Sequence, residues 1–138
     1  MATDLKKVLS ISGQQGLFRY LSHANQGAIV ESFLTKKRFA TGLSAKITAL
    51  SDISIFTETG EIKLQDLFEN MKAKLGEAAA PSGKSDAKEL KAFFEEVLPD
   101  YDKDRFYVSH MKKVVEWYNY LREYASLDFE KEEEGSEN

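Results

Sequence analysis

A series of short strand-like segments between residues 16 and 57 constrains the fold of this chain more than any other feature. Segments 17–22, 28–33 and 38–41 carry alternating side chains, which are typical of strands, and turn-forming residues separate them. Segment 46–57 is rich in β-branched residues and is either kinked or divided into two strands. This succession predicts a meander curled into a small antiparallel β-barrel of the SH3-like or Sm-like kind.

Helical patterns follow the strand-like region, so the predicted fold class is α+β. In segment 63–75 the apolar residues share one face of a helix, and we expect this helix to pack on the barrel. Asp86 is typical of a helix N-terminus, and Pro99 would end the helix that it begins. The last helix is predicted to begin at Ser109, as its N-cap, and to end near Tyr124. The last two helices would form a C-terminal α-helical hairpin.

Composition and charge divide the chain into modules. We predict a barrel domain with its helix over residues 1–75, a linker over 76–84, the helical hairpin over 85–127 and an acidic disordered tail over 128–138. The first half of the chain carries a charge of +3 and the rest −7, which together give the net charge of −4. This asymmetry supports the division into modules.

Several classes of protein are excluded by what the sequence lacks. The absence of cysteine excludes disulfides, thiolate nucleophiles and zinc sites built on cysteine. No apolar stretch approaches the roughly 20 residues of a membrane span, and the first residues do not read as a signal peptide. We therefore expect a cytoplasmic protein that does not contact membranes.

No catalytic or metal-binding pattern is complete. His23 and His110 belong to no HExxH or paired-histidine motif, and we expect both to be exposed to solvent. Asp100, Asp102 and Asp104 alternate as in a calcium loop, but the required glycine and glutamate are missing at the sixth and twelfth positions. The sequence therefore predicts a non-enzymatic protein with no catalytic residues, no metal and no cofactor.

Aromatic side chains are concentrated in the last predicted helix. Neighbouring residues of a helix lie about 100° apart, so Trp117, Tyr118 and Tyr120 cannot all face one packing partner. Some aromatic surface is then left for another element or another chain, and such residues are favoured in protein interfaces. We predict protein–protein interaction or self-association, with Trp117, Tyr120 and Tyr124 as the candidate partner-binding residues.

The alternative function is weak RNA or DNA binding by the barrel. Basic side chains interleaved with aromatic ones can hold phosphates and stack bases. The candidate nucleic-acid-binding residues are Arg19, Lys36, Lys37, Arg38, Phe39 and Lys46. The acidic second module weighs against this alternative.

Two parts of the chain resemble one family of bacterial proteins. The first is DLKKVLSISGQQGLFRYLS over residues 4–22, followed by GAIVES and ALSDISIF, which resembles the N-terminal domain of a small uncharacterised Bacteroidetes family. The second is KELKAFFEEVLPDYDKDRFYVSHMKKVVEWYNYL over residues 88–121, which resembles the C-terminal segment of that family. The family is known as a domain of unknown function. The resemblance therefore implies a bacterial, cytosolic protein and assigns a role to no residue.

Overall fold

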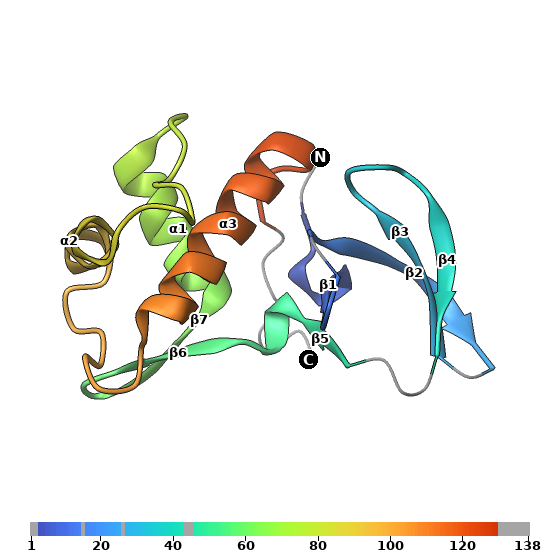
Figure 1. The fold of residues 1–138 in the computed structure, drawn as a ribbon, viewed down its shortest axis with the longest axis horizontal. Coiled ribbons are helices and arrows are strands. Elements are labelled where there is room, and N and C mark those ends of the chain that lie inside the picture. Colours follow the sequence, from blue (N-terminus) through green and yellow to red (C-terminus); the bar gives the residue numbers. More distant parts are fainter. Residues whose placement is uncertain (1–2, 15, 26, 43–45, 130–138) are drawn as a thin grey trace, which may run out of the picture.

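The helices gather at one end of the molecule and the main sheet lies at the other, with one long ribbon running beneath the helices (Figure 1). This computed structural model describes residues 3–14, 16–25, 27–42 and 46–129. Over those ranges the fold is α+β, with a five-stranded antiparallel sheet, a two-stranded ribbon and three α-helices. The acidic tail predicted over 128–138 lies outside the described ranges from residue 130 onward, whereas Asp128 and Phe129 belong to the described part.

The five-stranded sheet contains the segments that the alternation of side chains predicts. Its strands follow in the order β4-β3-β2-β1-β5, and every neighbouring pair is antiparallel. The predictions of strands at 17–22, 28–33 and 38–41 are confirmed by β2, β3 and β4. The bounds are β1 (Val8–Ile11), β2 (Phe18–Ala24), β3 (Gly27–Ser32), β4 (Arg38–Thr41) and β5 (Ile47–Ala49), with a 3₁₀ turn η1 (Leu5–Lys7) before β1.

The predicted SH3-like or Sm-like barrel is wrong. β4 and β5 are the two edges of an open sheet, and no strand pairing joins them within the described ranges. The 3₁₀ turn η2 (Leu50–Asp52) takes the chain out of the sheet, and β6 (Ser54–Thr57) then pairs with β7 (Gly60–Lys63) as a separate ribbon. The physical reason is burial: Leu50 and Ile55 pack into the core beside the helices instead of closing the sheet.

The helices are α1 (Leu64–Leu75), α2 (Ala87–Val97) and α3 (Val108–Tyr124). The N-cap prediction for Asp86 is confirmed, because its carboxylate accepts a hydrogen bond from Glu89 N over 2.8 Å. The prediction that Ser109 is the N-cap of α3 is wrong, because the N-cap is Tyr107. The predicted C-terminal hairpin is also wrong: α2 packs against α1 as well as α3, and all three helices contribute to one core.

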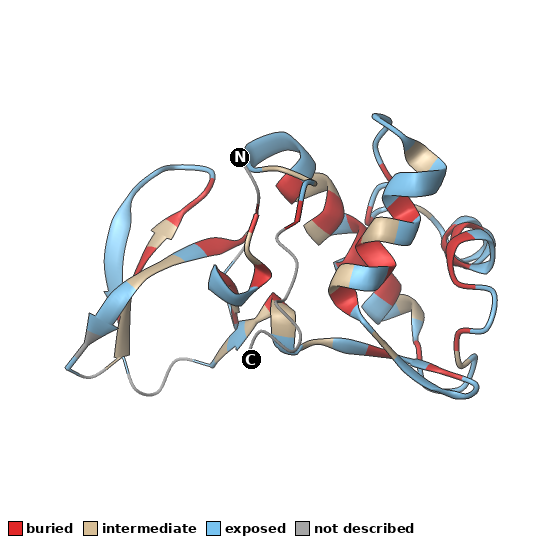
Figure 2. Ribbon diagram, turned by 180° about the vertical axis from the view of Figure 1, so that it is seen from behind, coloured by how far each residue is buried: buried red, intermediate tan, exposed pale blue. Residues whose placement is uncertain are grey.

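The main hydrophobic core joins the inner strands to the three helices. Val8 and Leu17 reach it from the sheet, and Phe68 of α1 meets the ring of Tyr118 of α3 with centroids 5.7 Å apart. The chain returns to this core at Phe129, whose ring stacks on Phe68. Figure 2 shows the buried positions concentrated where the helices face one another, while the outer strands are largely exposed. Segments on both sides of residues 76–84 therefore share one core.

A smaller apolar cluster lies on the opposite face of the sheet. Side chains alternate along a strand, so Leu9 and Phe18 point away from the face occupied by Val8 and Leu17. Leu9 and Phe18 pack with the fully buried Val30. The inner strands thus contribute to the main core on one face and to this smaller cluster on the other. Among the described residues, no helix is long and apolar enough to cross a bilayer.

We expect Tyr118→Phe to raise the free energy of unfolding by about 1 kcal/mol. The side chain of Tyr118 is fully buried, and its hydroxyl has no hydrogen-bond partner in the described part of the chain. A buried polar group left unpaired costs roughly 1–3 kcal/mol, and phenylalanine removes it while keeping the ring. Chemical denaturation of both proteins measures the difference, and a variant less stable than the wild type would contradict the expectation.

The same residue predicts a loss of stability in alkali. Burial raises the pKa of Tyr118 above its ordinary value of 10.0. The unfolded chain therefore releases the phenolic proton at lower pH than the folded one. Below pH 10.0 this ionisation does not affect the free energy of unfolding, and as pH rises from 10.0 through the pKa of the folded state it lowers that free energy. The difference in unfolding free energy between the wild type and Tyr118→Phe should move in favour of the variant above that pH.

Candidate functional site

A broad groove of about 710 Å³ lies between α3 and the end of the sheet where β1 turns into β2. We call it the α3 groove. All the predicted partner-binding residues, Trp117, Tyr120 and Tyr124, line it. They follow one another along α3 at spacings of three and four residues, which places them on one side of a helix. The structure therefore brings this set together on one concave surface.

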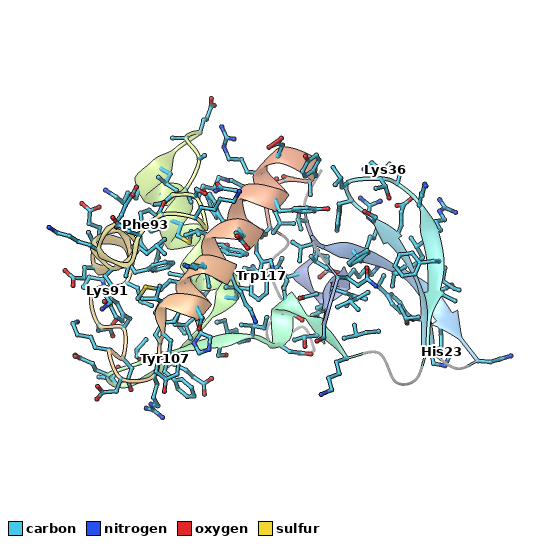
Figure 3. The ribbon with its side chains drawn as sticks, viewed as in Figure 1. His23, Lys36, Lys91, Phe93, Tyr107 and Trp117 are labelled. Atoms are coloured by element: carbon cyan, nitrogen blue, oxygen red, sulfur yellow. The ribbon has the colours of Figure 1, made fainter. Side chains whose placement is uncertain are left out.

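The aromatic wall of the groove is held from below by the core. Trp117 and Tyr120 are half-buried and pack against the main hydrophobic core, while Tyr124 is 37% exposed at the rim. The rings of Tyr120 and Tyr124 are 4.9 Å apart and tilted by 54°. Figure 3 shows Trp117 on the side of α3 that faces the sheet. Tyr118 is turned about 100° away from Trp117 around the helix, and it packs into the helical core against Phe68.

The sheet supplies the opposite wall. Gly16 has a φ of +84°, and a Cβ placed on it would lie 2.6 Å from the hydroxyl oxygen of Tyr120. Only glycine allows both this backbone conformation and this close approach. Ile11 and the 53% exposed Leu34 also line this side, so the groove has apolar groups on both walls.

The third wall is the segment between α1 and α2, which α3 holds through polar side chains. The amide of Asn119 accepts a hydrogen bond from Ala80 N over 2.8 Å and donates one to Ala80 O over 3.1 Å. Arg122 donates two hydrogen bonds to Glu77 O, of 3.0 and 2.7 Å. Gly83 lies so close to the carboxylate of Glu116 that a Cβ there would clash. The segment predicted as a linker is therefore attached to α3 and shapes the groove.

Charges of both signs surround the apolar surface. Lys84 and Lys113 line the groove together with Glu116 and Glu123. Aromatic and aliphatic side chains flanked by mixed charges suit a polypeptide segment better than a highly charged polymer. No group of three or more histidine, aspartate or glutamate side chains that could hold a metal ion is found in the part of the chain that the structure describes.

The candidate nucleic-acid-binding residues lie away from the α3 groove. Arg19 and Arg38 both approach Glu31, at 3.8 and 3.4 Å, and Arg19 also lies over the ring of Phe33. Phe39 packs edge-on against Phe18, with ring centroids 5.6 Å apart. Glu31 therefore offsets part of the positive charge of this surface.

The lysines of the same set are exposed but separated along the sheet. Lys36 and Lys37 belong to the turn between β3 and β4, and Lys46 directly precedes β5 at the other edge. Figure 3 shows Lys36 at the tip of its turn. Binding of nucleic acid by this surface stays a prediction.

The predicted exposure of both histidines is confirmed. His23 lies near the tip of the β2–β3 hairpin (Figure 3), and His110 is in the first turn of α3, where its ring lies over that of Phe106. The aspartates that alternate between α2 and α3 shape a turn. Asp102 accepts hydrogen bonds from Asp104 N and from the side chain of Arg105, whose guanidinium holds the pKa of this carboxyl below its ordinary value.

Sequence reasoning missed the walls that face the aromatic helix. Nothing in the strand pattern identifies Ile11, Gly16 and Leu34 as neighbours of α3, because the contact joins segments about a hundred positions apart. Gly16 is a signal that could have indicated this contact. A turn accounts for its positive φ, but the close approach of Tyr120 also requires a residue without a side chain at this position.

Comparison with known proteins identifies two adjoining domains. The domain of unknown function DUF5606 matches residues 5–50, and the domain of unknown function DUF6852 matches residues 53–121. A solution NMR structure of a protein from Bacteroides vulgatus is 35% identical, with a TM-score of 0.73 over 93% of this chain and 98% of the other. No match is found among curated proteins. The α3 groove lies where the two domains meet, with its sheet wall in the first and α3 in the second.

Proposed function

This chain belongs to the Bacteroidetes-type family in which DUF5606 is followed by DUF6852, and we propose that it is a non-enzymatic protein-interaction module whose α3 groove binds an apolar segment of a partner protein. The observation that carries the proposal is the line of Trp117, Tyr120 and Tyr124 along one wall, opposite the exposed Leu34. Grooves at domain junctions are common binding sites, and aromatic anchors carry much of the energy of protein interfaces.

The mixed charges at the rim favour a protein partner. Interfaces combine apolar side chains with polar ones, and the groove has aromatic side chains with Lys113 and Glu123 beside them. A second copy of the chain is one such partner, and the oligomeric state in solution decides whether it is the relevant one. The absence of cysteine from the sequence supports a cytoplasmic location as part of the proposal.

Peptides selected from a random display library test the proposal. The chain has a single tryptophan, Trp117, and it lies in the groove, so its fluorescence reports occupancy directly. Bound peptide should exclude water from the indole and shift the emission to the blue. We expect Tyr124→Ala and Leu34→Asp each to weaken binding by about tenfold, which corresponds to roughly 1.4 kcal/mol.

Tyr107→Ala is the matched control for Tyr124→Ala. Tyr107 is a tyrosine of α3's N-terminus, is 57% exposed and does not line the groove, so its removal should leave the affinity unchanged. If sedimentation shows a dimer that Tyr124→Ala dissociates, the partner is a second copy. Failure to select any peptide, together with a monomer in solution, would overturn the proposal, as would equal affinity for all three variants.

A further inference from the structure

One edge of β6 is open over part of its length. Leu64 N donates a hydrogen bond to Ile53 O over 3.0 Å, so residues 53 and 64 face each other as a hydrogen-bonded pair. Counting along the β6–β7 register in steps of two, the next such pairs are 55 with 62 and 57 with 60. Hydrogen-bonded and non-hydrogen-bonded pairs alternate in an antiparallel ladder. The N–H and C=O of Ile55 therefore point toward β7, while those of Ser54 and Phe56 point to the other side of β6, away from β7. The outward direction agrees with the hydrogen bond that Phe56 O accepts on that side, from residue 102.

Three backbone groups on this edge have no protein partner among the described residues. They are the N–H and C=O of Ser54 and the N–H of Phe56. The segment that pairs with the end of β6, through the bridge between Thr57 and Tyr101, turns away before it reaches them. An unpaired edge of this kind is a template for the backbone of an added strand.

An apolar hollow of about 240 Å³ lies beside this open edge. Ile55 supplies one wall, and Phe106, Val114 and Trp117 supply the side formed by the start of α3. Along β6 the buried and exposed positions alternate, so Ile55 faces the hollow and the core while Ser54 and Phe56 face solvent. An added strand would direct the side chains on this face toward the hollow.

The charge around the hollow is positive. The guanidinium of Arg105 and the ammonium of Lys113 line it beside the ring of His110, and no carboxylate among the described residues does so. The guanidinium of Arg105 lies 4.2 Å from the ring centre of Phe56, on the solvent face of the ribbon, and donates a hydrogen bond to Asp102 over 2.8 Å. An acidic side chain next to the apolar one on an added strand would find a cation on that face.

We propose that the open edge of β6 binds an extended segment of another protein in which apolar side chains alternate with acidic ones. The segment adds a third strand to the ribbon through Ser54 and Phe56, with its apolar side chains beside Ile55 and its acidic ones near Arg105. This site is separate from the α3 groove and shares only Lys113 and Trp117 with it.

A short peptide in which valine alternates with glutamate is the probe, and one in which valine alternates with lysine is its charge control. Titration followed by Trp117 fluorescence measures affinity, and amide hydrogen exchange follows Ser54 and Phe56 directly. We expect the acidic peptide to bind at least tenfold more tightly than the basic one and to slow exchange at both amides. Equal affinity of the two peptides, or no binding of either, overturns the proposal.

Ser54→Pro tests the backbone contact itself. Position 54 is the first residue of β6 and directs its N–H outward, where proline is tolerated in a strand. The preceding Ile53 has φ −93° and ψ 133°, which suits a residue before proline. We expect Ser54→Pro to lose at least tenfold in affinity and Ser54→Ala, which keeps the N–H, to bind as the wild type does.

A peptide with alternate backbone nitrogens methylated keeps the test decisive if Ser54→Pro does not fold. If the methylated peptide no longer binds the wild type, strand pairing is supported. Strand pairing is overturned if the methylated peptide binds as well as the unmodified one, or if a folded Ser54→Pro variant binds the unmodified peptide with unchanged affinity. Leu34→Asp and Tyr124→Ala, which belong to the α3 groove, should leave this peptide's affinity unaltered. The two sites can therefore fail independently.

Discussion

Phe68→Ala is expected to lower the free energy of unfolding by about 3–5 kcal/mol, the usual cost of truncating a fully buried phenylalanine. Phe68 joins three parts of the chain, because its ring meets Tyr118 of α3 and stacks on Phe129 after it. That loss is a large share of the roughly 5–15 kcal/mol that stabilises an ordinary domain. Urea denaturation of the variant and the wild type gives the difference.

The same experiment asks whether the sheet and the helices unfold together. The core that Phe68 belongs to includes Val8 and Leu17 of the sheet, so we expect one transition, coincident by Trp117 fluorescence and by the amide signals of β2 and β3. Phe56→Ala is the matched control: this ring is 43% exposed, and its removal should cost no more than about 1 kcal/mol. A sheet that stays folded after the helices have melted would contradict a shared core.

The strands and helices could be predicted because their signals are local. Alternation of side chains located β2, β3 and β4, and the apolar stripe over 63–75 located α1. β7 was missed because no strand was expected between residue 57, where the strand-like region ends, and the helix predicted from residue 63. The N-cap of α3 was misplaced because Ser109 is a frequent capping residue, whereas Tyr107 is not.

The arrangement of these elements could not be predicted from local signals. A barrel and an open sheet can share the same strand lengths and turns, and here the burial of Leu50 and Ile55 beside the helices accompanies the open sheet. Leu50 is fully buried between the sheet and the helices, so the chain leaves the sheet at η2. The positions of buried side chains relative to distant elements are long-range information, which periodicity within a window does not contain.

Of the walls of the α3 groove, only the aromatic one on α3 was predicted from the sequence. The aromatic wall could be found because Trp117, Tyr118 and Tyr120 cannot all face one partner on a single helix. The sheet wall could not, since Leu34 is an exposed apolar residue in a turn, and single exposed apolar residues are common on protein surfaces. The open edge of β6 was missed for a different reason: it depends on which backbone groups of β6 face β7, and β7 itself was not predicted.

Asn119→Ala is expected to lower the free energy of unfolding by about 2 kcal/mol and to weaken binding in the α3 groove. The substitution removes both hydrogen bonds to the backbone of Ala80, which is buried, and a buried backbone group left unpaired costs roughly 1–3 kcal/mol. Asn70→Ala is the matched control, because the side chain of Asn70 donates one hydrogen bond, of 3.2 Å to Val97 O, and its removal should cost about 1 kcal/mol.

The effect on binding follows from what Asn119 holds in place. Residues 82–84 form the third wall of the α3 groove and follow directly after the attached Ala80 and Pro81. Freed from α3, this wall would have to be ordered again by the bound segment, and that entropy cost appears as lost affinity. We expect groove-selected peptides to bind several-fold more weakly to Asn119→Ala but normally to Asn70→Ala, each measured well below its unfolding temperature. Equal affinity for both variants would mean that the wall keeps its place without Asn119, and the groove would then depend on α3 and the sheet alone.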